Sequence, residues 1–173
     1  MKHALLGLAA ASAVLAGCAT GDGVVIHNRY QAADYNYASM QYYNADKPSF
    51  VEVHNNPYSG ADADDRIASL MRGHNAGRPI LFTADRNYAG GDTKFVVVFN
   101  PPSSMTGYAA CNLDGGQAGA GGDQGKVLMS YCVNGQDKSS LRASASSVEN
   151  LLARGTHELL PEVFTKKQGS GNS

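Results

Sequence analysis

Two histidines and two aspartates between positions 54 and 74 have the chemistry of cation ligands. Carboxylate oxygens bind hard cations, and imidazole nitrogens bind transition metals. His54 and His74 would approach each other if the segments that carry them pack together. Asp62 and Asp64 also suit the start of a helix, where carboxylates bind free N–H groups and oppose the helix dipole. We therefore treat these four as possible ligand or metal-binding residues, and expect no resident metal ion or cofactor.

Two segments begin like catalytic motifs and then depart from them. His157-Glu158-Leu159-Leu160-Pro161 starts like the zinc-protease sequence His-Glu-x-x-His, but a proline stands where the second imidazole is required. The glycine-rich run 119–126 has an alanine in place of the first glycine of a phosphate-binding loop, and valine follows its lysine where a hydroxyl residue is needed. Neither Gly-x-Ser-x-Gly nor Cys-x-x-Cys occurs. The sequence therefore predicts no catalytic residue.

The first residues of the chain have the pattern of an export signal. Lys2 and His3 form a short basic start, and Ala4 to Leu15 is an almost uninterrupted apolar segment. A permanent membrane-spanning helix needs about 20 such residues, so this segment is too short. A buried first helix of the domain is the alternative, but the segment lacks the polar face that such a helix would have. A basic start, a short apolar core and small residues before a cleavage site predict a signal peptide over residues 1–17.

The end of that segment, Leu15-Ala16-Gly17-Cys18, resembles the lipobox of bacterial lipoproteins. The resemblance implies cleavage between Gly17 and Cys18, a diacylglycerol on the Cys18 sulfur and an acylated amino terminus. Two or more acyl chains hold a protein stably on a bilayer. Ala19, by similarity to enteric lipoproteins, implies delivery to the outer membrane. The protein is therefore expected on the periplasmic side of the outer membrane, bound to that membrane through its lipid anchor.

Cys111 and Cys132 remain once Cys18 is assigned to lipid. Disulfides form and persist in exported proteins, and a bridge over this interval would contribute roughly 3 kcal/mol. The alternative is two separate buried thiols. We expect the disulfide. If it joins strands over 106–112 and 126–133 directly, Cys111 faces Cys132 and the turn falls within 117–126.

Composition limits the classes of partner. The chain has 14 Lys and Arg against 15 Asp and Glu, with a formal net charge of −1. Such a balance supplies no electrostatic footprint for nucleic acid and no polybasic patch for anionic lipid. Twenty glycines and the absence of tryptophan favour a loop-rich domain with β-structure. The length after cleavage suits one domain.

Hydrophobic periodicity predicts the elements of that domain. Residues 49–54 alternate as a strand does, with Phe50, Glu52 and His54 on one face, and 95–99 is continuously apolar, as in a central strand covered on both faces. Further strands are expected over 79–83, 106–112, 126–133 and 138–143. Helices are expected from about 64 to 74 and from Ser146, where Ser146 and Glu149 fit a capping box.

This order predicts an α+β fold: a mainly antiparallel or mixed sheet of about five to six strands with two helices packed on one face. The expected organisation is a signal peptide (1–17), a tyrosine-rich tether (18–47), the domain (48–166) and a disordered tail (167–173). The tether tyrosines have two interpretations. They either pack loosely on the domain or bind a partner, because tyrosine offers a large contact area at low entropy cost.

The functional hypothesis is a lipid-anchored envelope protein, a non-enzymatic scaffold or assembly accessory with an envelope protein as partner and no nucleic acid. The closing Leu-Leu-Pro-Glu-Val-Phe, residues 159–164, and the order of elements are similar to those of small bacterial envelope lipoproteins. A periplasmic module that binds a small ligand or metal through loops 55–65 and 101–107 is the alternative. An enzyme with a dispersed active site is a third hypothesis.

Overall fold

The computed structural model describes residues 23–45, 47–89, 91–113, 118–119 and 122–162. Within them, six strands form one sheet: β1 (Val25–Gln31), β2 (Pro48–His54), β3 (Leu81–Thr83), β4 (Thr93–Phe99), β5 (Lys126–Val133) and β6 (Gln136–Ser144). The helices of the same residues are α1 (Tyr37–Asn44), α2 (Ala63–Met71), the 3-10 helix η1 (Arg86–Tyr88), α3 (Gly107–Cys111) and α4 (Val148–Leu159).

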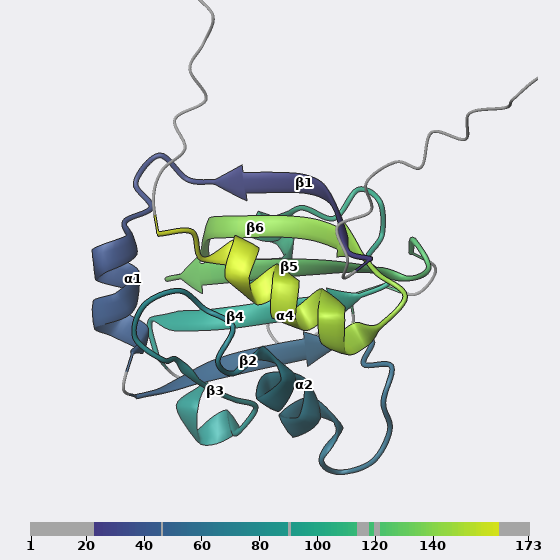
Figure 1. Ribbon diagram of the computed structural model, residues 1–173, viewed down its shortest axis with the longest axis horizontal. Coiled ribbons are helices and arrows are strands. Elements are labelled where there is room, and N and C mark those ends of the chain that lie inside the picture. Colours follow the sequence, from purple (N-terminus) through teal and green to yellow (C-terminus); the bar gives the residue numbers. More distant parts are fainter. Residues whose placement is uncertain (1–22, 46, 90, 114–117, 120–121, 163–173) are drawn as a thin grey trace, which may run out of the picture.

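The sheet is mixed, with strand order β1-β6-β5-β4-β2-β3 (Figure 1). β2 runs parallel to both β3 and β4, and the other neighbours are antiparallel. α2 and α4 cover the face seen in Figure 1. The predicted α+β class, with a mixed sheet and two helices on one face, is confirmed.

The central strand β4 is buried on both faces, as its continuous apolar sequence predicts. Phe95, Val97 and Phe99 belong to the large core beneath α2 and α4. Val96 and Val98 belong to a smaller core on the opposite face. Since burying apolar surface stabilises a fold by about 25 cal/mol per Å², the two cores anchor β4 firmly from both faces.

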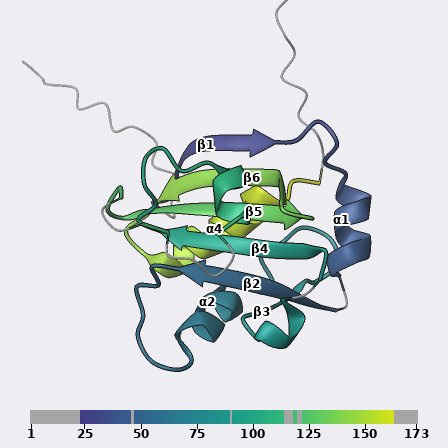
Figure 2. The same cartoon turned by 180° about the vertical axis from the view of Figure 1, so that it is seen from behind.

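The opposite face, seen in Figure 2, is covered by α3, where the sequence had predicted a strand over 106–112. That prediction was wrong because Thr106 is a helix N-cap: its hydroxyl accepts the Ala109 N–H at 3.1 Å. Cys111 nevertheless forms the expected disulfide with Cys132, at a Cα–Cα distance of 5.7 Å. The bond joins a helix to β5, so the direct pairing of two cysteine strands is corrected.

β5 instead forms a hairpin with β6 through Asn134 and Gly135. Both residues have positive φ, 50° and 72°, which a tight two-residue turn requires and which Asn-Gly adopts readily. The turn had been predicted within 117–126, in a glycine-rich stretch that lies partly outside the described residues. The hairpin therefore closes after the second cysteine, not between the two.

The ordered domain begins well before Pro48, which corrects the predicted tether of residues 18–47. β1 pairs with β6 from Val25 to Gln31, and α1 docks against the end of the sheet. β1 was not predicted because it is an edge strand with mostly exposed side chains. Its sequence therefore has no apolar alternation. The predicted signal peptide (1–17), Cys18 and the predicted tail 167–173 lie outside the described residues.

α4 begins one residue later than the predicted capping box. Ser147, not Ser146, is the N-cap, and its hydroxyl accepts the Asn150 N–H at 3.2 Å. The helix continues through Gly155, where a Cβ would come within 2.5 Å of Met129 Sδ. Glycine therefore allows α4 to lie close to β5. Among the described residues, no helix has both the length and the apolar character needed to cross a membrane.

Candidate functional site

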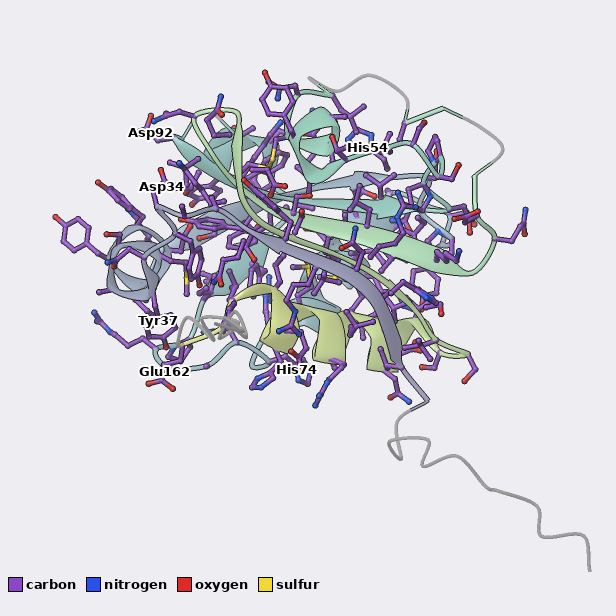
Figure 3. All side chains as sticks on the ribbon, turned by 90° about the horizontal axis from the view of Figure 1, so that it is seen from above. Asp34, Tyr37, His54, His74, Asp92 and Glu162 are labelled. Carbon is purple, nitrogen blue, oxygen red and sulfur yellow. A yellow bond between two sulfur atoms is a disulfide. The ribbon has the colours of Figure 1, made fainter. Side chains whose placement is uncertain are left out.

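The possible cation ligands predicted from the sequence do not come together. His54 lies on the α3 face of the sheet, whereas His74 follows α2 on the other face, and Figure 3 shows them on opposite sides of the molecule. Asp64 accepts a hydrogen bond from the Asn56 amide at 2.7 Å. Asp62 is the N-cap residue of α2, although its side chain makes no capping hydrogen bond. The described part of the chain contains no group of three His, Cys, Asp or Glu arranged to hold a metal ion.

His54 belongs instead to a buried cluster on β2 and β4. Its Nε2 lies 3.0 Å from Glu52 Oε1, and Glu52 Oε2 lies 2.7 Å from Lys94 Nζ. Glu52 and His54 are only 7% and 8% exposed. A buried carboxylate is tolerated where it is paired and hydrogen-bonded. The cluster therefore ties two parallel strands together and leaves His54 engaged inside the fold.

Three exposed tyrosines gather at one end of the sheet. Tyr42 and Tyr43 come from α1 with exposed fractions of 78% and 45%, and Tyr88 from η1 is 45% exposed. We call these three residues the tyrosine surface. Tyr43 lies edge-on to Tyr42, with ring centroids 5.4 Å apart, and Lys47 Nζ stands 5.8 Å from the Tyr43 ring. A cavity of about 450 Å³ opens between Tyr43 and Tyr88.

The tyrosine surface lies at the end of the sheet opposite Gly23. β1 starts at the right of Figure 1 and runs toward α1 at the left. A seven-residue strand is about 23 Å long, so this is the separation between the two ends. These tyrosines are therefore grouped at one end of the domain and not scattered singly over its surface.

A second cavity, also about 450 Å³, lies between α3 and the β1–β6 edge of the sheet, and we call it the β6 cavity. Its apolar lining includes Met105 and Leu128, and the half-exposed rings of Tyr30 and Tyr108 border it. Met105 belongs to loop 101–107, which the ligand-binding alternative had named. The other loop in that alternative, 55–65, does not line this cavity.

Asp137 supplies the carboxyl group of the β6 cavity. Its Oδ2 accepts a hydrogen bond from Ser140 Oγ at 2.7 Å. Its Oδ1 is buried and has no hydrogen-bond partner within the described structure. Burial raises the pKa of this carboxyl, and the Ser140 hydrogen bond opposes that rise in pKa. Asp137 therefore lines the cavity with one carboxyl oxygen unpartnered and with its charge incompletely stabilised.

A β-bulge directs Asp137 into the cavity. The β5–β6 register passes from Tyr131–Ser139 to Cys132–Asp137, so Lys138 is an extra residue in β6. In a regular strand, residues 137 and 140 would point to opposite faces. The bulge turns Asp137 to the face of Ser140, which is a function that bulges serve beside binding sites.

Asp137 was not predicted from the sequence, because a bulge depends on how two strands pair and not on residue order alone. The tyrosines of α1 were noted, but the helix that gathers them was not predicted. Comparison of the chain with protein-family models, curated proteins and solved structures finds no match. The geometry of these two surfaces is therefore the basis for assigning a role.

Proposed function

We propose that this chain is a lipid-anchored, non-enzymatic protein of the outer membrane that faces the periplasm and docks an envelope protein partner on its tyrosine surface. The observation that carries the proposal is the exposure of Tyr42, Tyr43 and Tyr88 at one end of the domain. Tyrosine is enriched at protein interfaces because its ring supplies contact area and its hydroxyl keeps a polar partner.

Chain length supports a domain held close to the bilayer. Residues 19–23 alone separate Cys18 from Val24, the first buried residue of the described fold. Six peptide units span at most about 20 Å. A lipid on Cys18 would thus keep the Gly23 end of the sheet near the membrane, and the tyrosine surface would face away from it.

The chemistry of the tyrosine surface supports a protein partner. The aromatic rings stand beside one cation, Lys47, and one anion, Asp92, which also lines the cavity there. Such a mixture of aromatic area and few charges is typical of the centre of a protein interface. The non-enzymatic assignment is supported by the incomplete motifs at residues 119–126 and 157–161.

The anchor is tested by fractionation of cells that express the full chain and its Cys18→Ser variant. The full chain should sediment with outer membranes and carry a diacylglycerol on the Cys18 sulfur by mass spectrometry. The variant should leave the membrane fraction. Equal retention of the two proteins in the membrane would contradict the anchor.

The docking surface is tested by a photoreactive phenylalanine analogue placed at position 42 in the membrane-bound protein. One discrete adduct with an envelope protein is expected on irradiation of intact cells. The same analogue at the exposed Ser103, in the loop after β4, is the matched control and should give no such adduct. Combined Tyr43→Ala and Tyr88→Ala substitution should abolish the adduct. Its formation from position 103 as well, or its persistence after the substitutions, would contradict the proposal.

A further inference from the structure

We propose that the β6 cavity binds a small molecule that carries a protonated amine, with Asp137 as the anionic partner of that amine. This site is separate from the tyrosine surface, and the inference does not depend on the proposed docking function.

Asp137 retains hydrogen-bonding capacity that the described residues do not use. A buried oxygen without a donor costs free energy, and native proteins leave few such groups. Asp137 Oδ1 is one of them among the described residues, while Oδ2 is already bonded to Ser140. The missing partner is therefore a donor, and the residue that lacks it lines an open cavity.

The local structure is arranged around the Asp137 carboxyl group. The bulge at Lys138 turns Asp137 inward. Gly107, the first residue of α3, has no side chain, and a Cβ there would overlap both the Asp137 carboxyl and the Ser140 hydroxyl. The glycine thus lets the backbone of α3 approach the acid closely. The bulge and the glycine together place the Asp137 carboxyl group on the cavity wall.

The surroundings of this carboxyl group favour a cation. A partly buried carboxylate is stabilised by a positive charge within a few ångströms, and burial raises the pKa of Asp137. The rings of Tyr30 and Tyr108 border the same cavity, and aromatic faces attract ammonium groups. Tyr30 is paired with Ser140 across β1 and β6, which directs both side chains to the same face.

Arg142 is the cation that already faces the cavity, and its guanidinium group is committed elsewhere. It donates to the carbonyl oxygens of Pro102 and Met105 at 3.0 and 2.8 Å, and more weakly to that of Pro101 at 3.4 Å. Its Nη1 is also 3.9 Å from Asp123 Oδ2. Arg142 therefore orders loop 101–105 along the rim, five residues along β6 from Asp137, and leaves the carboxyl group to the ligand.

The size of the cavity sets the size of the ligand. Sites for small molecules usually measure about 300–1,000 Å³, and the β6 cavity falls within that range at about 450 Å³. Its apolar lining, which includes Met105 and Leu128, suits a compact hydrocarbon or aromatic ligand. A ligand of this kind with an ammonium group would complement the Asp137 carboxyl group, the tyrosine rings and the apolar lining.

The test uses the full-length protein in a non-ionic detergent and a panel of small alkyl- and arylamines, each with the alcohol of the same carbon skeleton. Binding is followed by calorimetry and by the backbone amide signals of Gly107, Tyr108 and Ser140. At least one amine should bind more tightly than its alcohol, and Asp137→Asn should weaken that amine at least tenfold while leaving the alcohol within twofold.

Asp65→Asn is the matched control, because Asp65 is an exposed carboxylate on α2 at the other face of the sheet. It should leave amine affinity within twofold. The inference is overturned if no amine of the panel moves the three amide signals. It is equally overturned if Asp137→Asn and Asp65→Asn weaken the amine to the same extent.

Discussion

Asn44 donates its side-chain amide hydrogen to the Tyr131 hydroxyl at 3.0 Å, in the buried contact between the last turn of α1 and β5. The same amide nitrogen donates to the Met40 carbonyl, and the Asn44 Oδ1 accepts from the hydroxyls of Ser49 and Thr93. All four hydrogen-bonding positions of the amide group are therefore filled. This one side chain connects α1 to β2, β4 and β5, and it makes α1 part of the domain.

Replacement of Asn44 should accordingly loosen α1 from the sheet. We expect Asn44→Ala to lower the free energy of unfolding by about 3 kcal/mol, because it leaves several buried groups without partners. Tyr131→Phe removes only one of these bonds and should cost about 1 kcal/mol. Urea denaturation followed by circular dichroism measures both. Similar losses in the two variants would contradict the role of Asn44 as a hub.

These particular residues show where sequence reasoning succeeds and fails here. The strand over 95–99 was predicted correctly because a short run of valine and phenylalanine that ends before Asn-Pro-Pro favours a buried strand. α1 was missed because two of its three buried residues, Gln41 and Asn44, are polar, so the segment has no clear hydrophobic period. Asp137 was missed because its orientation depends on the pairing of β6 with β5. Periodicity reports burial along one segment, whereas a hub or a bulge is set by contacts between segments.

The Cys111–Cys132 bond should stabilise both the fold and the β6 cavity. It fixes α3, which carries Gly107 and Tyr108, against β5 across a sequence separation of 21 residues. We expect combined Cys111→Ser and Cys132→Ser substitution to lower the free energy of unfolding by about 3 kcal/mol. Amine affinity should fall in the same variant. Thermal melting and calorimetry measure the two effects, and an unchanged melting temperature would contradict the first.

Substitutions of Gly155 and Met129 should have non-additive effects on the free energy of unfolding. Gly155→Ala favours the helix by about 1 kcal/mol on intrinsic propensity, yet the new Cβ meets the fully buried Met129 Sδ. We expect the overlap to prevail and the variant to lose about 1–2 kcal/mol. Met129→Ala alone should also destabilise, through the cavity it leaves. The double variant should be more stable than the sum of the two losses predicts, and strict additivity in urea denaturation would exclude the contact.

Asp137 should destabilise the folded state at neutral pH. Its pKa is raised in the folded state above the ordinary value of 3.8, because burial disfavours the charged form. The folded protein therefore holds this proton more tightly than the unfolded chain, and its stability falls as pH rises from 3.8 through the folded pKa. Asp137→Asn removes the titration while an amide oxygen can still accept from Ser140. The variant should gain stability over the native protein across that interval, and the gain should level off at higher pH.

Asp34 provides a control of opposite sign for that measurement. Its hydrogen bond with Lys138 lowers the pKa of its carboxyl group, so its stabilising effect is present above 3.8 and is lost as pH falls through the folded pKa. Asp34→Asn should therefore lose stability at neutral pH, by less than the Asp137 gain because Asp34 is exposed to solvent. Urea midpoints between pH 3 and pH 7 measure both variants. A gain for Asp137→Asn that does not change with pH would show that charge burial is not its cause. A gain that grows with pH, together with lost amine binding, would show that this acid is retained at the expense of stability, as expected of a ligand-binding group.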